Sequence, residues 1–360
     1  MDDSVFDVKG TLVTQSQFQD IDKKGGENKL LFTAPCSSIT PTFWEELYEK
    51  KLNVYKLNDS SQPIIGTLTA DGLLFTKGSF DIIDDNSVFD AKGTLINMNT
   101  QSQFQDIDKK NFIDNLGKKL IESMKNGLAI SNPSVLLHFS FLSYADLKSY
   151  SFLYWLCMPA IVPSFPFSLL HSPIKPQRNF LFAIYEKMTN LNPFQHVFVL
   201  VKTTLEVLTL KDGWNIINDD KTIIVTLDLG NDNAYSWSLR NLLALLSIHL
   251  LKKVSIIALR NPFMNKIKTL KLEDVLNADV SSFIEVLLGD KSLIDDYKVI
   301  GFESNQRGKP GPRIVSCGSF LDTKEVMRQA VDLNIKLMKW RQWPSLDTEK
   351  LKNTRCLLIG

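Results

Sequence analysis

Four cysteines and four histidines are the side chains of this sequence most capable of nucleophilic or metal chemistry. A thiol needs a neighbouring base to act as a nucleophile, and Cys157 is flanked in the sequence by His138 and His171. Cys157 lies in an apolar run, and burial raises the pKa of a thiol, so a structural cysteine is favoured over a catalytic one. The cysteines lack CxxC spacing and the histidines lack ligand spacing, so we expect neither a zinc site nor a disulfide framework.

Two stretches could be suspected of binding phosphate. The sequence RCLLIG predicts a buried parallel strand ending at Gly360, and a glycine after a strand often begins a nucleotide-binding turn. No further glycines follow Gly360 in this sequence, so we expect no working nucleotide site within it. The basic stretch from Arg307 to Arg313 lacks the strand and helix that flank a P-loop, which favours a solvated loop.

Four other side chains are candidates for contact with a partner. Asp146 and Tyr150 lie in SYADLKSY, a polar interruption between two apolar runs; a turn between strands is the plainer interpretation and partner contact the alternative. Trp237 and Arg240 form a pair of the kind found in binding hot spots. A core tryptophan at the start of a helix is the favoured interpretation of Trp237, and partner contact is the alternative.

The composition is that of a globular protein with nearly balanced charges. Of 360 residues, 44% are apolar and 22% charged, and 41 basic against 40 acidic residues give a net charge of +1. Nucleic acid is therefore not an expected partner. The scattered cysteines fit a reducing cytosolic setting.

One stretch imitates a membrane span. No residue between Lys148 and Lys175 carries a fixed charge, and YSFLYWLCMPAIVPSFPFSLL is strongly apolar. Pro159, Pro163 and Pro166 would each remove a helix hydrogen bond within two turns, which a lipid environment does not tolerate. We expect a buried strand that ends in a proline-rich loop, and no membrane span.

The periodicity of the apolar residues predicts a mixed α and β protein. A short helix should follow a cap at Thr40 or Thr42, a second should cover 111–125 and stop at Asn126-Gly127, and a long one should cover 323–341. TIIVTLDL, WSLRNLLALLSIHLLKK and KVSIIALR have the strand, helix, strand order of a parallel crossover. Further strands are predicted in VLLHFSFL, FLYWLCM, HVFVLVK, LEVLTL, SSFIEVLL, YKVIGFES and PRIVSC.

The sequence also contains one long phrase twice. SVFDVKGTL and TQSQFQDIDKK stand within residues 4–24, and SVFDAKGTL and TQSQFQDIDKK stand within 87–110. The first copy is three residues shorter across the join and lacks two asparagines that the second copy has. Two nearly verbatim copies of unequal length are untypical of solenoid repeats and indicate a local duplication. We expect the first copy to be extended or disordered.

Several stretches resemble one family. YADLKSYSFLYWLCMPA, WSLRNLLAL, GFESNQRGKPGPRIV and AVDLNIKLMKWRQWPSLDTEKLKNTRCLLIG are similar to the autophagy activating enzymes, autophagy-related protein seven. The similarity covers about residues 29–360. The second copy fits the family pattern at Asn97, Asn99, Thr100, Phe104, Asp108 and Lys109.

The resemblance implies an activating enzyme for ubiquitin-like autophagy modifiers. Family members adenylate the modifier with ATP, form a thioester on a cysteine and pass the modifier to the autophagy conjugating enzymes, autophagy-related proteins three and ten. Their amino-terminal domain recruits the conjugating enzymes, whereas the carboxyl-terminal domain holds ATP, the modifier, the catalytic cysteine and the homodimer contact. Those catalytic residues lie beyond the position of Gly360, so none is assigned in this chain.

The resemblance predicts three segments: a duplicated extension over 1–28, the recruiting amino-terminal domain over 29–318, and the first helix and strand of an adenylation domain over 319–360. Two hypotheses stay open. The chain is a binding module for conjugating enzymes, or it is the front part of a complete ATP-dependent activating enzyme. In either case we expect this chain to bind no cofactor, to be inactive and monomeric alone, and to reside in the cytoplasm near sites of autophagosome assembly.

Overall fold

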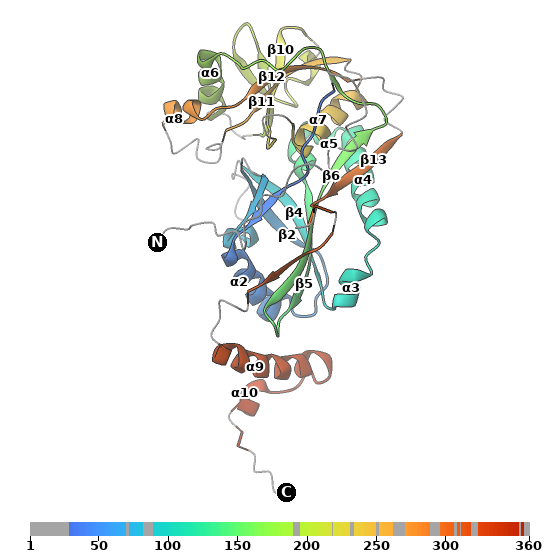
Figure 1. The fold of residues 1–360 in the computed structure, drawn as a ribbon, viewed down its shortest axis with the longest axis vertical. Coiled ribbons are helices and arrows are strands. Elements are labelled where there is room, and N and C mark those ends of the chain that lie inside the picture. Colours follow the sequence, from blue (N-terminus) through green and yellow to red (C-terminus); the bar gives the residue numbers. More distant parts are fainter. Residues whose placement is uncertain are drawn as a thin grey trace.

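Two β-sheets and the helices around them make up the protein (Figure 1). The structure is a computed structural model, and it describes residues 29–69, 72–81, 89–189, 195–217, 219–230, 234–249, 252–261, 271–288, 296–305, 308–309, 311–317, 323–352 and 354–355. The chain builds most of the eight-stranded sheet, then the six-stranded sheet, and returns to the first with its last two strands.

The eight-stranded sheet has the order β1-β3-β2-β4-β5-β6-β13, with β14 also paired to β6. Its strands are β1 (Ser37–Ile39), β2 (Gln62–Thr69), β3 (Gly72–Phe75), β4 (Asp90–Met98), β5 (Phe139–Asp146), β6 (Ser151–Pro163), β13 (Tyr297–Phe302) and β14 (Arg313–Ser316). The pairs β1–β3 and β4–β5 are parallel and the others antiparallel. The mixed α/β class is thereby confirmed.

The six-stranded sheet has the order β7-β12-β11-β10-β8-β9. Its strands are β7 (Ser168–Leu169), β8 (Val197–Val201), β9 (Glu206–Thr209), β10 (Thr222–Leu227), β11 (Lys253–Leu259) and β12 (Ser282–Leu287). The parallel pairing of β10 with β11 confirms the predicted crossover, with Ile224 opposite Ile256 in the register.

Helices cover both faces of each sheet. They are α2 (Pro41–Lys50), α3 (Gln101–Gln105), α4 (Lys109–Lys125), α5 (Leu128–Ser131), α6 (Arg178–Thr189), α7 (Trp237–Ile248), α8 (Leu272–Asn277), α9 (Thr323–Arg341) and α10 (Thr348–Lys352). A π-helical turn (Lys51–Tyr55) and 3₁₀ turns at Lys77–Phe80, Pro133–Leu137 and Trp214–Ile216 complete them. Helix α2 packs on one face of the larger sheet and α3 and α4 on the other, while α7 and the pair α6 and α8 cover opposite faces of the smaller one.

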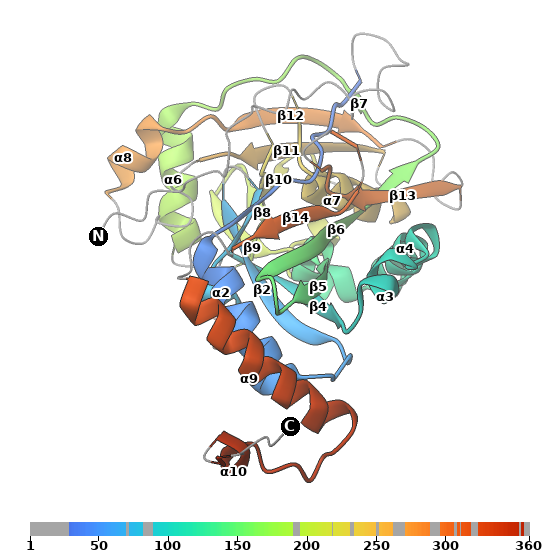
Figure 2. The same ribbon diagram turned by 60° about the horizontal axis from the view of Figure 1, so that its bottom comes forward.

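The predicted helices form, with one difference at a cap. Thr40 stands at the N-cap position of α2, but its hydroxyl donates to Phe75 O instead of capping the helix. Helix α4 ends at Lys125, and Gly127 has φ +81°, the left-handed conformation that favours glycine after a helix. Helix α9 has the predicted bounds, and Figures 1 and 2 show it with α10 at the lower end of the molecule.

The stretch that imitates a membrane span is β6, the long central strand of the larger sheet, as predicted. It pairs with β5, β13 and β14, and its apolar side chains are buried in the cores on the two faces of the sheet. Asn241 of α7 lies beside Pro159 in this strand; its amide accepts from Ile161 N at 3.0 Å and donates to Pro159 O at 2.9 Å. Among the described helices, none is both long and apolar enough to cross a bilayer.

Helix α7 is buried on every side. The sequence predicts one apolar stripe, but all twelve residues from Trp237 to Ile248 are buried. The helix lies between the six-stranded sheet and a wall formed by β6 and α4, so its polar residues are enclosed as well. Its serines and Asn241 therefore need partners inside the protein.

The second copy of the duplicated phrase is built into the larger sheet. Asn97 is 4% exposed and accepts from Ser143 Oγ at 2.6 Å. Asn99 accepts from the buried Lys51 Nζ at 2.8 Å and donates to Leu57 O at 2.8 Å, which fastens the π-helical turn to the end of β4. These are the two asparagines that the first copy lacks. That copy, at residues 4–24, lies outside the described residues.

The rest of the same pattern starts two helices. The Thr100 hydroxyl caps α3, the Asp108 carboxylate caps α4 at 3.0 Å from the Asn111 amide, and Phe104 is buried beneath them. Lys109 Nζ lies 4.6 Å from the centre of the Trp155 ring. The pattern is therefore explained by folding requirements.

Candidate binding sites

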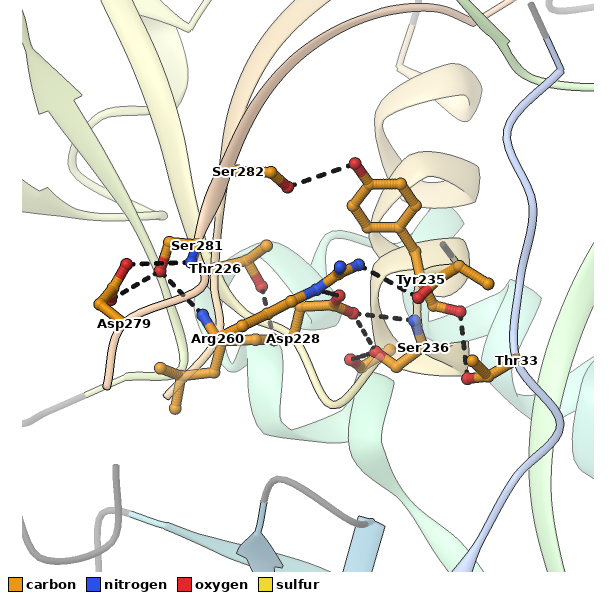
Figure 3. A network of polar contacts seen from close by, with 12 residues as sticks. Thr33, Thr226, Asp228, Tyr235, Ser236, Arg260, Asp279, Ser281 and Ser282 are labelled. Atoms are coloured by element: carbon orange, nitrogen blue, oxygen red, sulfur yellow. Dashed lines mark hydrogen bonds and ion pairs between the residues drawn. The ribbon is translucent and has the colours of Figure 1, made fainter. Parts of the chain in front are cut away.

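The crossover brings two charged side chains to one edge of the six-stranded sheet. Asp228 directly follows β10 and Arg260 directly follows β11, and the carboxyl ends of parallel strands meet at the same edge. In α/β sheets this edge is the usual place for a ligand. Figure 3 shows Asp228 and Arg260 meeting there, beside the start of α7.

Asp228 is the centre of the network. Its side chain is 0% exposed, and its Oδ2 lies 2.7 Å from Arg260 Nε. Its Oδ1 accepts from Ser236 N at 2.8 Å and from the Ser236 hydroxyl. Ser236 is the N-cap residue of α7, so the carboxylate sits against the positive end of the helix dipole.

Arg260 extends the network across the sheet edge. Its guanidinium lies 4.3 Å from the centre of the Tyr235 ring and donates to Ala234 O at 3.1 Å. Its backbone amide donates to Ser281 Oγ at 2.9 Å, and that hydroxyl donates to Asp279 Oδ2 at 2.9 Å. The network thus joins the strand ends on both sides of β11 (Figure 3).

Asp279 is in turn tied to helix α6. The buried Tyr185 hydroxyl donates to Asp279 Oδ2. Burial, together with the negative charge of Asp279, raises the pKa of Tyr185 well above its ordinary value, so the phenol stays protonated and remains a donor. The whole network is buried and internally paired.

This arrangement is suited to holding the fold, not to binding phosphate. The amides at the start of α7 are where a phosphate would sit in a nucleotide-binding crossover, and the Asp228 carboxylate occupies that position. A second anion there would face a buried negative charge. The adjoining cavity measures about 60 Å³, whereas ligand pockets usually exceed about 300 Å³.

Trp237 and Arg240 both lie inside the protein. Trp237 is 3% exposed and packs with the core that joins the two sheets. Arg240 is 4% exposed, and its guanidinium lies 4.0 Å from the centre of the Phe32 ring. Neither side chain is exposed to a partner, and partner contact by these two residues stays a prediction.

Asp146 and Tyr150 flank the β5–β6 hairpin, as the turn interpretation requires. Asp146 is half-buried and accepts from Lys148 N at 3.1 Å and Ser149 Oγ at 2.8 Å. Tyr150 has φ +51° and stacks on Tyr48 with ring centres 3.8 Å apart. Burial raises the pKa of Tyr150, which keeps the phenol neutral. These two residues lie together, apart from Trp237 and Arg240.

The cysteine and histidines do not form a catalytic pair. Cys157 is buried among the side chains between β6 and α4, and burial raises the pKa of its thiol. His138 lies 3.2 Å from Thr94 Oγ1, and burial lowers its pKa. His171 pairs instead with Glu285. Within the described ranges, no group of three metal-binding side chains comes together.

The two stretches suspected of binding phosphate are Gly360 and the basic loop 307–313. Gly360 lies outside the described residues. Among the described residues of the basic stretch, Lys309 accepts at its carbonyl from Asn305 N at 2.8 Å, in a tight loop that leads into β14. Arg313 turns inward, with its Nη1 3.3 Å from Glu303 Oε1, so its charge is used inside the fold.

Sequence reasoning missed the buried charges Asp228, Arg260, Glu303 and Lys51. A signal was present for the first two. Each is a charged residue placed directly after an apolar strand on either side of the same crossover helix. Glu303 also directly follows a strand, β13, but its partner Ser37 lies 266 residues away, and Lys51 has no such pattern because its partner Asn99 lies 48 residues away.

Comparison with known proteins identifies relatives along most of the chain. Residues 30–321 match the sequence profile of the family described as ubiquitin-like modifier-activating enzyme ATG7 N-terminus. The ATG7 enzymes of Gallus gallus and Homo sapiens are both 32% identical over 93% of this chain. The alignments cover 50% of each relative, so the chain spans about half the length of the curated relatives it matches.

Solved structures share the fold. The Kluyveromyces marxianus Atg7NTD in its complex with Atg10 superposes with a TM-score of 0.60 at 20% identity, over 81% of this chain and 98% of that one. The same domain alone gives a TM-score of 0.59 at 21% identity, over 80% of this chain. The predicted domain fold is confirmed.

Proposed function

The chain belongs to the ubiquitin-like modifier-activating enzyme ATG7 family, and from that premise we propose that it recruits autophagy conjugating enzymes for modifier transfer. The observation that carries this proposal is the family match over residues 30–321, which covers both sheets. The Kluyveromyces marxianus domain with the same fold was solved in a complex with Atg10. By this reasoning the partners are the counterparts of Atg10 and of autophagy-related protein three.

The buried chemistry of the described residues supports binding over catalysis. Cys157 is buried with a raised thiol pKa, His138 and His171 contact Thr94 and Glu285, and the Asp228 carboxylate closes the start of α7. We therefore assign adenylation and thioester formation, which the family name implies, to no residue of this chain. As the second candidate, the chain acts as the front part of a complete activating enzyme, because its relatives are about twice as long.

A binding experiment tests the recruitment function. The full chain, shown to be folded by circular dichroism, is titrated with its cognate Atg10-type and Atg3-type conjugating enzymes in an isothermal calorimeter. We expect dissociation constants in the micromolar range or tighter for at least one of them. If a folded sample shows no binding to either enzyme at concentrations about 100-fold above that range, the proposal is contradicted.

The β5–β6 hairpin allows a test of the predicted contact residues. Asp146→Arg reverses a half-buried charge at the hairpin, and Asp81→Arg is a matched reversal at an exposed carboxylate elsewhere. If the hairpin contacts the partner, only Asp146→Arg weakens binding. Equal affinities for both variants would place the contact elsewhere.

An enzymatic assay separates the two candidate functions. We expect the chain alone to show no modifier-dependent exchange of pyrophosphate into ATP. Exchange by the purified chain would assign the adenylation step to it and contradict the binding-module proposal. We further propose a cytoplasmic, monomeric protein; imaging of a tagged chain and light scattering test these two points.

A further inference from the structure

The eight-stranded sheet curls so that its first strand approaches its last one. Strand β1 pairs only with β3, and β14 pairs only with β6, among the strands that the structure describes. One side chain bridges these two strands. Glu303 follows β13, is 2% exposed, and contacts both Ser37 of β1 and Arg313 of β14.

The contacts of Glu303 are unequal at its two oxygens. Oε1 accepts from Ser37 N at 2.7 Å and lies 3.3 Å from Arg313 Nη1. The Ser37 hydroxyl is 2.9 Å from Oε1 and also 2.9 Å from Oε2. Among the described residues, the Ser37 hydroxyl is the side-chain partner of Oε2.

This geometry accommodates a proton without rearrangement. When a proton from solvent binds Oε2, the new O–H can donate to Ser37 Oγ. The hydrogen of the Ser37 hydroxyl can stay on Oε1, and the bonds from Ser37 N and Arg313 to Oε1 remain in place. Both charge states therefore keep the bridge, but only the ionised one leaves a negative charge buried.

The surrounding groups compensate that charge poorly. Arg313 is the cation facing it, and Arg313 is 27% exposed and also donates its Nε–H to Ser304 O. Tyr154 of β6, whose pKa burial raises so that the phenol is neutral, faces the same pair, as does Cys36 just before β1. By contrast, Asp228 has a 6% exposed guanidinium at 2.7 Å. Burying a charge without close pairing is costly.

We propose that Glu303 is a proton-operated latch, which holds β1 against β14 more firmly when its carboxyl group is protonated. Burial raises the pKa of Glu303 from 4.5 to about 7, although Arg313 and the Ser37 bonds act in the opposite direction. Because the folded pKa is the higher one, the stabilisation is complete below pH 4.5 and is lost as the pH rises through 7.

The latch would act on the segment that connects the two sheets. Residues 29–37 run from the six-stranded sheet to the larger one, with Leu30 N donating to Phe167 O at 3.0 Å and Thr33 N to Tyr235 O at 2.7 Å. The far end of this segment is Ser37, whose amide donates to Glu303. When the latch is weakened, this end of the connection is held by the pairing of β1 with β3 and no longer firmly by Glu303.

The first test follows stability with pH. Urea unfolding of the full chain is compared with that of Glu303→Gln, whose amide mimics the protonated carboxyl group, between pH 4.5 and 8. Over this pH range we expect the unfolding equilibrium constant of the unaltered chain to rise about 150-fold more than that of the variant, from the two pKa values of 4.5 and about 7. Parallel curves would overturn the proposal.

Two further measurements keep the test independent of how the variant folds. Carbon NMR of the unaltered chain should show a glutamate carboxyl titrating near pH 7, and titration of all glutamates below pH 5 would refute the latch. Amide exchange at Ser37, corrected for intrinsic rates, should accelerate between pH 6 and 8.

A surface carboxylate provides the control. Burial acts to raise the pKa of Glu285, but the hydrogen bonds from Lys253 and Ser255 outweigh it and lower the pKa. Glu285→Gln should therefore change the pH dependence in the opposite sense, on the acidic side. If Glu285→Gln abolished the loss of stability near pH 7, that transition would belong to Glu285 and not to Glu303, and the proposal would be overturned.

Discussion

Replacing Asp228 by asparagine should cost the protein a large part of its stability. The substitution keeps the shape of the side chain and an oxygen that can accept from Ser236 N, but it removes the negative charge opposite Arg260. The guanidinium would then remain 6% exposed beside Ala234 O and the Tyr235 ring, without the negative charge of residue 228. A buried cation without its counter-ion is strongly destabilising.

The magnitude follows from the geometry. At a separation of 2.7 Å and an effective dielectric constant of about 20, the attraction between the two charges is about 6 kcal/mol. Part of this is recovered when the freed guanidinium draws in water, so we expect a net loss of about 3–5 kcal/mol in the free energy of unfolding. A protein of ordinary stability, about 5–15 kcal/mol, would be left marginal.

Urea unfolding followed by circular dichroism measures this loss, and a surface pair supplies the control. Lys253 Nζ lies 3.1 Å from Glu285 Oε1, but these side chains are 48% and 22% exposed. Because solvent screens such a pair, Glu285→Gln should cost no more than about 1 kcal/mol at pH 7. If Asp228→Asn were as mild as this control, the Asp228–Arg260 pair would not contribute substantially to the stability of the fold.

Three smaller predictions address local features. Burial lowers the pKa of Lys51 to about 8, so the stability of the unaltered protein should rise with pH between 8 and about 10.5. Lys51→Met should abolish that rise in urea unfolding measured at several pH values. At pH 7 it should increase the free energy of unfolding by about 1–3 kcal/mol, reduced by the loss of the hydrogen bond to Asn99. Lys56 has φ +53° and ψ −115°, a conformation that favours glycine, in a turn closed by the hydrogen bond from Asn58 N to Tyr55 O. Lys56→Gly should therefore raise the free energy of unfolding by about 1 kcal/mol. A lower free energy of unfolding would show that the backbone at Lys56 is not strained. Gly117→Ala should lower the free energy of unfolding by about 1–3 kcal/mol in urea unfolding, although alanine has the better helix propensity. The reason is that the added Cβ would clash with Val299 Cγ2. A gain in stability would show that Val299 moves aside at little cost.

Local sequence patterns predicted most elements because their causes are local. The spacing of apolar residues located α4 and α9, and the prolines of the long apolar run identified β6 as a strand. The order of strand, helix and strand predicted the β10–α7–β11 crossover. Each of these depends on residues within a few turns of one another.

The candidate site was predicted less well for the same reason. Trp237 and Arg240 have residue types that suit a binding surface, yet α7 is enclosed on all sides by the sheet, β6 and α4. No local pattern distinguishes a helix with one covered face from a helix with every face covered when its polar residues are few. Burial of that kind depends on elements far away in the sequence.

Local sequence patterns were sufficient for the class of fold, the positions of the principal helices and strands, and the family resemblance that the profile match over 30–321 supports. The sequence also distinguished the two copies of the duplicated phrase, because only the second has the asparagines that fix Lys51 and Ser143. The tertiary structure alone decided which charges are buried together. Asp228 meets Arg260 across 32 residues, and Ser37 meets Glu303 across 266, because pairing of a charge in the core depends on how the sheets close and not on spacing along the chain.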